Sequence, residues 1–383
     1  MYSLSDYGRI LGDKERGDAY RRALKKVITP ETIVLEIGTG TGMFALEACR
    51  CGARRVYAVE IDNVIHYARQ VAEENGYGDR IVFIQEDSTK VELPEKADVI
   101  FSDLRGKLPL FNRHVSVIMD ARRRFLAPGG TLIPQRDKLM AAISSAPVLY
   151  DAYRDSWIPP ESGLHAEVLQ DAITNNIWWD AAAAEETLIT DPVLWFTLNY
   201  RVLETQDAEG GASWRISQPG TAHGIRVWFD AELLDDIGFS NRPGAGDRIY
   251  GNVFFPWPQP VSLQVGDSVT VAFTAKLMDD DYVWRWNSTI VPAGRNAREK
   301  ISFRQSTFSG TPPSLTEMRK AAADFRPALN EDGRIKYQIL ALMNDGLQLN
   351  EIAQKIQDTF PGRFRNKAEA LRLVSRTSIK YSK

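Results

Sequence analysis

Val34-Leu-Glu-Ile-Gly-Thr-Gly-Thr-Gly42 is the stretch that decides the fold of this chain, and Val56-Tyr-Ala-Val-Glu-Ile-Asp62 follows it. Together they read as a buried strand, a glycine-rich turn, a helix and a second strand that ends in a carboxylate. Three glycines occupy the turn: Gly38, Gly40 and Gly42. Glycines let a backbone approach a ligand closely, and an acid in the position of Glu60 accepts hydrogen bonds from ribose hydroxyls. The sequence therefore predicts an adenosine pocket on an α/β sheet.

Glu36 indicates which adenosine compound fits this pocket. The glycine spacing is Gly-x-Gly-x-Gly, and Glu36 lies two residues before the first glycine. A carboxylate there repels a pyrophosphate but attracts the ammonium group of S-adenosylmethionine. We therefore predict S-adenosylmethionine, a methyl donor, as the cofactor. The alternative is a tight strand–helix connection that binds nothing.

The composition is that of a soluble globular protein. The chain has 383 residues, 44% of them hydrophobic and 25% charged, and a net charge of −3. This length suits two or three domains, and this charge gives no general argument for nucleic acid or membrane binding. We find no long apolar run and no leader, so we expect a cytoplasmic protein. Cys49 and Cys51 read as reduced thiols, and with four scattered histidines we expect no metal site.

Four regions follow from hydrophobic periodicity. Residues 1–32 read as amphipathic helices, and residues 33–135 alternate strands with helices, which predicts a Rossmann-like domain with a parallel sheet. Residues 136–310 carry period-two segments typical of an antiparallel β-barrel, with a sandwich as the alternative. A helical insertion interrupts them at about 147–185. Residues 319–383 return to helices as a winged-helix-like module, with a helix-turn-helix-like one as the alternative.

Two loops after predicted strands carry further candidate residues. Asp87 and the backbone amide of Ser88 follow the third strand, where they would read the adenine ring; the alternative is a solvated acidic loop. Asp103 follows the fourth strand at the same edge of the sheet, where it would face the transferred methyl group. The alternative for Asp103 is a helix N-cap.

With these motifs in place, the chain resembles the protein arginine methyltransferases from about residue 5 to about residue 295. The resemblance implies that Arg16 grips the carboxylate of the methyl donor. It also implies that the insertion is a dimerisation arm, so we expect a homodimer. The segments that carry the likeness are Leu11–Arg16 with Tyr20-Arg21, Val34–Gly42, Val56–Asp62, Val91–Pro94, Phe125–Gly130 and Gly238–Ser240.

The chain departs from this family in the loop that holds the substrate. The family places two glutamates nine residues apart to bind a guanidinium, whereas this chain has Asp103 and Asn112. The Thr-His-Trp position of the family reads Arg248-Ile249-Tyr250. We therefore expect a neutral or anionic methyl acceptor, oriented or deprotonated by Asp103 and hydrogen-bonded by Asn112. Three residues are predicted to bind this substrate: Arg105, Arg248 and Tyr250.

The tail from 319 to 383 lies outside this resemblance. It holds thirteen Lys or Arg against seven Asp or Glu, and Leu342–Ala353 is similar to winged-helix domains that recognise leader peptides. We predict a methyltransferase that acts on a peptide, a protein or a small natural-product intermediate. Two alternatives stay open: a silent scaffold that binds S-adenosylmethionine, and a regulator that binds nucleic acid through the tail. Nucleic acid is the less expected partner of the tail.

Overall fold

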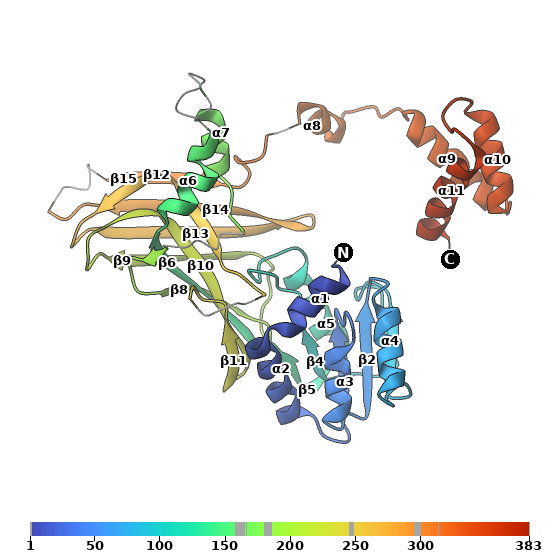
Figure 1. The fold of residues 1–383 in the computed structure, drawn as a ribbon, viewed down its shortest axis with the longest axis horizontal. Coiled ribbons are helices and arrows are strands. Elements are labelled where there is room, and N and C mark those ends of the chain that lie inside the picture. The colour runs from blue at the N-terminus through green and yellow to red at the C-terminus, as the bar shows by residue number, and fades with distance from the viewer. Residues whose placement is uncertain are drawn as a thin grey trace. The chain divides into compact units, whose positions relative to one another are not determined.

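The computed structural model divides the chain into two compact units, Met1–Thr311 and Pro312–Lys383 (Figure 1). Each unit has its own hydrophobic core. The structure describes residues 2–157, 165, 167–179, 186–244, 249–294, 300–312 and 314–382.

The first unit begins with a parallel five-stranded sheet in the order β3-β2-β1-β4-β5. All four neighbouring pairs are parallel, as strands joined by helices must be. The order reverses between β1 and β4, so the loops after these strands diverge and leave a crevice. The strands are β1 (Ile33–Ile37), β2 (Arg55–Glu60), β3 (Ile81–Gln85), β4 (Ala97–Ser102) and β5 (Leu126–Ile133).

Helices precede this sheet and connect most of its strands. Ser3 and Asp6 form a capping box that starts the first helix, and the side chain of Asp13 caps the second. The second helix buries Tyr20 and Leu24 in the main core. The helices of this region are α1 (Leu4–Gly12), α2 (Lys14–Val27), α3 (Met43–Arg50), α4 (Ile65–Glu74) and α5 (His114–Phe125).

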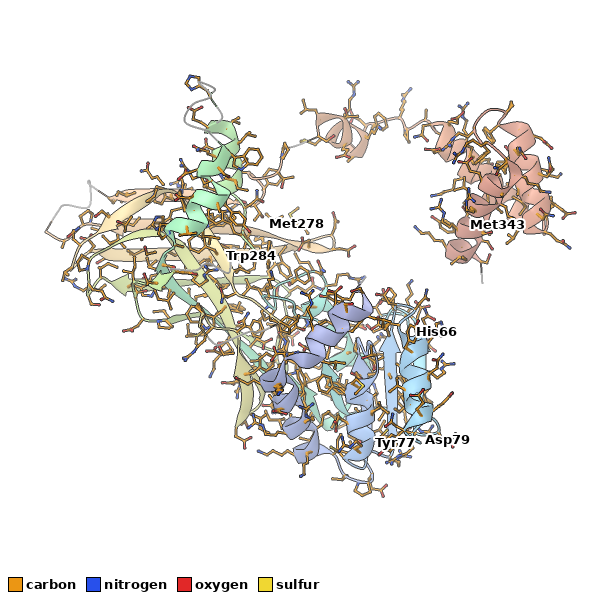
Figure 2. The ribbon with its side chains drawn as sticks, viewed as in Figure 1. His66, Tyr77, Asp79, Met278, Trp284 and Met343 are labelled. Atoms are coloured by element: carbon orange, nitrogen blue, oxygen red, sulfur yellow. The ribbon has the colours of Figure 1, made fainter. Side chains whose placement is uncertain are left out.

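After β5 the chain forms antiparallel strands. By hydrogen bonding they make two sheets, one built on β10 and β6 and one in the order β15-β14-β13-β9, which share the main core with the parallel sheet. Trp284 is buried in that core (Figure 2). The strands are β6 (Arg136–Ser145), β7 (Thr187–Leu188), β8 (Val193–Asn199), β9 (Ala208–Arg215), β10 (Gly220–Leu234), β11 (Ile237–Ser240), β12 (Val253–Leu263), β13 (Ser268–Met278), β14 (Asp281–Val291) and β15 (Ile301–Ser306).

The predicted insertion contains short helices where the structure describes it: α6 (Pro147–Tyr153), η1 (Asp155–Trp157) and α7 (Glu167–Thr174). Its base is anchored by Trp178, which pairs with Phe254 of β12 through two backbone hydrogen bonds. The ring of Trp178 also stacks on Tyr153 at a centroid distance of 4.8 Å. Aromatic packing therefore fixes the point where the insertion leaves the sheet.

The second unit is helical. Its core joins three helices through residues such as Ile339, Ile352 and Val374. In the described residues 314–382 of this unit there is no strand, so the predicted wing has no counterpart there. The helices are α8 (Leu315–Ala321), α9 (Glu331–Asn344), α10 (Leu349–Thr359) and α11 (Lys367–Tyr381).

The sequence-based prediction of the fold is confirmed in its main features. A Rossmann-like parallel sheet precedes antiparallel sheets, and all five strands of the parallel sheet lie within the predicted range 33–135. Where the sequence predicted one barrel, the hydrogen bonds between the antiparallel strands form two separate sheets. None of the helices that the structure describes is long and apolar enough to cross a membrane.

Because the second unit has its own core, we predict that it unfolds separately from the first. Ile352 is fully buried in α10, and Ile352→Ala removes about 2–5 kcal/mol of stability from this unit. Hydrogen-exchange mass spectrometry is expected to show faster exchange in 331–381 and unchanged exchange in the β1–β5 sheet. Ile379→Ala is the matched control, since Ile379 is 84% exposed. Equal acceleration in both units would contradict the prediction.

Candidate active site

The glycine turn after β1 has the backbone geometry that the sequence predicted. All three glycines have positive φ, at +79° for Gly38, +53° for Gly40 and +78° for Gly42. A Cβ atom on Gly38 would lie 2.5 Å from the side chain of Leu104, and one on Gly40 would lie 2.7 Å from the ring of Tyr7. The turn therefore needs glycine both for its conformation and for its close packing.

Glu36 is buried at the end of β1, directly below this turn. Its Oε2 accepts a hydrogen bond of 2.6 Å from the hydroxyl of Thr39. Burial, with a smaller contribution from the nearby Glu60, raises the pKa of Glu36 to about 8 against the opposing effect of the hydrogen bond from Thr39. A cation placed beside Glu36 would favour its ionised form.

Glu60 is the last residue of β2 and lies at the edge of the crevice. Its carboxylate accepts hydrogen bonds from the backbone amides of Gly40, at 2.9 Å, and Asp62, at 3.0 Å. These bonds hold the carboxylate beside the glycine turn, where both oxygens are oriented toward backbone donors. Glu36 and Glu60 therefore place two acids on one wall, as the sequence predicted.

The loop after β3 carries Asp87 and Ser88. Asp87 accepts hydrogen bonds from the amide and the hydroxyl of Thr89, at 2.9 and 2.7 Å, which with Arg113 lower the pKa of Asp87 against the effect of burial. The carbonyl of Ser88 accepts a hydrogen bond of 2.6 Å from Arg124. The loop is thus held in a fixed conformation with Asp87 ionised.

Asp103, at the start of the loop after β4, lies between two guanidinium groups. Its Oδ2 accepts a hydrogen bond of 2.7 Å from Nε of Arg16, and its Oδ1 lies 3.2 Å from Nε of Arg105. Burial alone would raise the pKa of Asp103, but Arg16 and Arg105 together lower it below its usual value. Asp103 is therefore ionised, and the guanidinium groups of Arg16 and Arg105 already neutralise its charge.

The structure corrects the predicted role of Arg105. Its side chain is 0% exposed and does not line the cavity. Its Nη1 contacts Asp137 at 2.8 Å, and its Nη2 donates to the hydroxyl of Tyr20. A fully buried guanidinium with these partners cannot reach a substrate, so Arg105 belongs to the wall behind the site.

The other predicted substrate residues have different outcomes. Asn112 is exposed at the cavity edge with φ of +44°, a conformation that asparagine tolerates better than most residues. Tyr250 lines the cavity, and its hydroxyl lies 3.4 Å from the carbonyl of Asp103. Arg248 lies outside the described residues.

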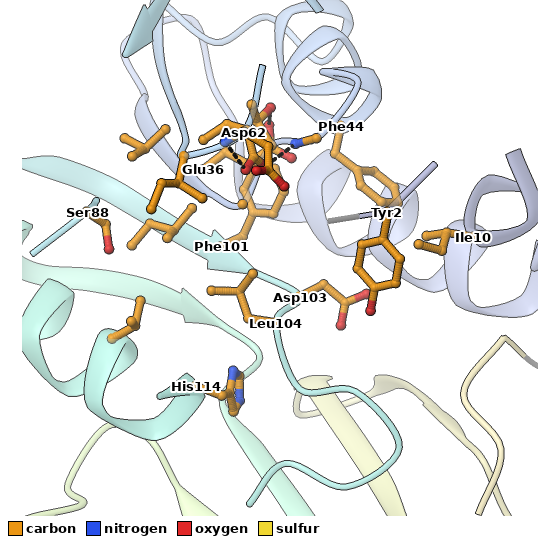
Figure 3. Close-up of a pocket in the computed structure, with 18 of the residues that line it drawn as sticks. Tyr2, Ile10, Glu36, Phe44, Asp62, Ser88, Phe101, Asp103, Leu104 and His114 are labelled. Atoms are coloured by element: carbon orange, nitrogen blue, oxygen red, sulfur yellow. Dashed lines mark hydrogen bonds between the residues drawn. The ribbon is translucent and has the colours of Figure 1, made fainter. Parts of the chain in front are cut away.

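Most of the predicted residues line one cavity, which we call the main cavity, of about 420 Å³. Figure 3 shows Glu36, Ser88 and Asp103 on different sides of it. The members that the sequence predicted are Arg16, Glu36, Gly38, Gly40, Glu60, Asp87, Ser88, Asp103, Asn112 and Tyr250. Gly42 does not line it; Gly42 instead precedes α3 and packs against Ala68.

A second cavity of about 270 Å³, the side cavity, adjoins the main one and shares Tyr2, Phe111 and Tyr250 with it. Trp179 from the base of the insertion also lines the side cavity, and its ring meets Phe111 edge-on at 6.0 Å. Aromatic rings therefore form much of its wall. No single sequence motif unites these residues, so sequence reasoning found Tyr250 but missed Tyr2, Phe111 and Trp179.

His114 is a further residue of the main cavity that the sequence did not single out. It begins α5 and is buried, two residues after Asn112. Burial, together with Arg105, lowers the pKa of His114 to about 3, so the imidazole is neutral. In the part of the chain that the structure describes, no group of three or more His, Cys, Asp or Glu side chains is placed to hold a metal ion.

The contents of the main cavity fit S-adenosylmethionine. Glu36 and Glu60 supply carboxylates for an ammonium group and for ribose hydroxyls, and Arg16 supplies a cation for a carboxylate. Asp87 is ionised at the far side, where an exocyclic amine would lie. The charged side chains of the main cavity therefore suit the polar groups of S-adenosylmethionine.

Comparison with known proteins gives matches to both parts of the first unit. The model of the family described as ribosomal protein L11 methyltransferase (PrmA) matches residues 21–134. Protein arginine N-methyltransferase 1 of Schizosaccharomyces pombe is 28% identical over 293 residues, which cover 72% of this chain and 83% of the relative. Protein arginine N-methyltransferase 2 of Dictyostelium discoideum is 24% identical over 248 residues, or 61% of this chain and 48% of that relative. The chain thus spans about half the length of this second relative.

A solved structure shares the fold. The Trypanosoma brucei PRMT1 enzyme–prozyme heterotetrameric complex with AdoHcy superposes with a TM-score of 0.71 at 17% identity, covering 78% of this chain and 96% of that chain. The glycine turn and its two acids lie inside the family match. The chain is an S-adenosylmethionine-dependent methyltransferase related to the protein arginine methyltransferases.

Proposed function

We propose that this methyltransferase acts on a neutral nitrogen or oxygen of a peptide or small molecule, and not on arginine. One observation carries the proposal: the Asp103 carboxylate is matched by Arg16 and Arg105, while its counterpart Asn112 is uncharged. A guanidinium is bound best by paired carboxylates that have no other cation. This loop offers no such pair.

The residues of the main cavity are proposed to hold the methyl donor as follows. Glu60 binds the ribose hydroxyls, Glu36 the ammonium group and Arg16 the carboxylate. Asp87 and the amide of Ser88 read the adenine. This assignment rests on the charge and position of each group around a single cavity.

The side cavity is the proposed place of the body of the acceptor, whose reacting atom enters the main cavity. It meets the main cavity at Tyr2, Phe111 and Tyr250, so a group seated there faces the donor. Its aromatic residues favour a flat or apolar group, and the carboxylate that lines it, Asp6, is already paired with Arg9 at 2.6 Å. Methyl transfer from a sulfonium is an in-line displacement, so the protein contributes mainly the alignment of donor and acceptor.

We also propose that the chain forms a homodimer through the insertion. Apolar side chains are exposed along its described helices: Val148, Trp157, Val168 and Leu169. Such a patch on a soluble protein indicates a contact surface. The related Trypanosoma complex is a heterotetramer, which is consistent with assembly in this fold.

The first prediction of this proposal concerns Glu36. Without ligand Glu36 is protonated below about pH 8, whereas the ammonium group of S-adenosylmethionine favours the carboxylate. Binding must then release a proton, so the affinity rises by up to about tenfold per pH unit between about pH 6 and pH 8. Calorimetry in buffers of different ionisation enthalpy measures the released proton. Glu36→Gln should remove it, whereas Glu47→Gln, on α3 outside the cavity, should not. Binding without proton release at pH 7 would refute this role of Glu36.

The second prediction concerns the acceptor. Blocked peptides with one central Arg, Asn, Gln, His or Ser are incubated with S-adenosylmethionine that carries a tritiated methyl group. Each missing charge-assisted hydrogen bond costs about 1.5–3 kcal/mol, so the Arg peptide should react at least roughly tenfold more slowly than the best neutral peptide. A preferred Arg peptide would sink the proposal. Donor binding without transfer to any peptide would favour a silent scaffold.

Asn112→Asp sharpens this experiment. It adds a carboxylate at the cavity edge, and aspartate tolerates a positive φ better than glutamate does. We expect this variant to increase methylation of the Arg peptide relative to the wild type. Asn75→Asp, an exposed asparagine after α4, is the matched control and should leave the preference unchanged.

The third prediction concerns the dimer. Val168 is 74% exposed on α7, and Val168→Asp places a charge in the proposed contact. Sedimentation should report a dimer of the 43.1 kDa chain for the wild type and a monomer for the variant. Val265→Asp, at an exposed valine between β12 and β13, should remain dimeric. A monomeric wild type would disprove the dimer.

A further inference from the structure

A chain of buried polar groups runs behind the wall of the main cavity and returns to it. Its two ends, Arg16–Asp103 and His114, line the cavity, whereas its middle does not. All of its members except Asp103 are buried by exposed area. In order, the members are Arg16, Asp103, Arg105, Asp137, Tyr200 and His114.

The second half of this chain fixes the hydrogen-bonding state of His114. Tyr200 donates its hydroxyl hydrogen to Oδ2 of Asp137 at 2.6 Å, and Asp137 is held at its other oxygen by Arg105 at 2.8 Å. Burial raises the pKa of Tyr200 well above its usual value, so Tyr200 keeps its hydrogen. Its oxygen can then only accept from Nε2 of His114, which lies 3.1 Å away.

It follows that the neutral imidazole carries its hydrogen on Nε2 and a lone pair on Nδ1. The ring of His114 also meets Tyr200 edge-on at a centroid distance of 5.6 Å, which fixes the plane of the ring. Contacts with Tyr200, which does not line the cavity, therefore determine both the tautomer and the orientation of the His114 ring.

Nδ1 of His114 is buried and has no hydrogen-bond partner among the described residues. A histidine that served the core alone would satisfy both nitrogens, because an unmatched buried acceptor costs about 1–3 kcal/mol. The ring lines the main cavity near Asp103 and Leu104, as Figure 3 shows. The unmatched lone pair therefore calls for a donor from a ligand.

We propose that Nδ1 of His114 accepts a hydrogen bond from the N–H or O–H of the methyl acceptor and takes that proton when the methyl group is transferred. This inference rests on the proposed neutral acceptor. A cationic guanidinium would need carboxylates to bind it, whereas a neutral N–H or O–H group of the acceptor needs only one lone pair to accept its hydrogen bond. Asn112, two residues earlier at the same cavity, is placed to hold the remaining polar atoms of the acceptor.

The step balances. The acceptor atom forms a bond to the methyl carbon, the carbon–sulfur bond of the sulfonium breaks, and its electron pair stays on sulfur. The acceptor then carries an excess proton, which passes to Nδ1 and leaves with solvent after the products separate. A weakly basic imidazole is sufficient because an amide or hydroxyl that has just been alkylated is a strong acid.

Two substitutions at His114 separate the roles of its nitrogens. His114→Asn keeps an acceptor oxygen near the place of Nδ1, and His114→Gln keeps a polar atom near the place of Nε2 but none at Nδ1. With the neutral peptide that the wild type labels, we expect His114→Gln to lower the rate of transfer about 100-fold or more. His114→Asn, which keeps the hydrogen-bond acceptor but not the base, should lower it less. Affinity for S-adenosylmethionine should match the wild type in both variants, and both should still show a cooperative thermal unfolding transition. The control is His66→Gln, at an exposed histidine of α4 (Figure 2).

The tautomer is tested without turnover. In protein labelled with ¹⁵N-histidine, His114 should show a protonated Nε2 and an unprotonated Nδ1 at pH 7, and Tyr200→Phe should disturb this state. A protonated Nδ1, or an imidazolium, overturns the inference whatever the activity. Equal loss in His114→Asn and His114→Gln also overturns it. Absence of transfer to any neutral peptide, with the predicted tautomer present, counts instead against the proposed function.

Discussion

The ion pairs of Asp103 are the interaction on which the rest of the site depends. A carboxylate in a buried wall requires a matched cation, and Asp103 has two, one from α2 and one from its own loop. Removing one partner of a buried pair costs about 3–5 kcal/mol, because the other charge is left unmatched. Arg105 in turn forms an ion pair with Asp137 on β6, so Asp137 also depends on a matched charge. The N-terminal helices, the parallel sheet and the antiparallel sheets are thus held together by alternating charges at the point where the cavity forms.

This arrangement divides the cavity into two electrostatic sides. On the side of Glu36 and Glu60, carboxylates have backbone or hydroxyl partners and, among the residues that the structure describes, no matched cation, so they suit a cationic ligand. On the side of Asp103, charges are already compensated and the remaining group, His114, is neutral. A positively charged donor and an uncharged acceptor fit these two sides better than two cations would.

Sequence reasoning found the first side more fully than the second. The glycines and the acids at Glu36 and Glu60 follow from a short local pattern, because strand, turn and helix are consecutive in the chain. The side of Asp103 depends on contacts between residues far apart, such as Arg105 with Asp137 and His114 with Tyr200. The charge of Arg105 was visible in the sequence, but its direction was not, so a wall residue was predicted to bind substrate. The helices of the C-terminal unit were predictable from periodicity, whereas the order of helices and turns alone did not show whether a wing accompanies them, and the described residues of this unit contain no strand.

The loss of the second carboxylate and the neutral His114 have a common physical explanation. A guanidinium acceptor must have its charge neutralised before it attacks a sulfonium, since two cations in a cavity of low dielectric repel each other strongly. Paired carboxylates provide that neutralisation in an arginine site. An acceptor without charge makes the second carboxylate unnecessary, and an extra anion would instead have to be buried without a partner. What such an acceptor needs is a lone pair that fixes its hydrogen and later removes it. Tyr200 and Asp137 hold the hydrogen of His114 on Nε2 and so leave Nδ1 a lone pair that has no partner among the described residues.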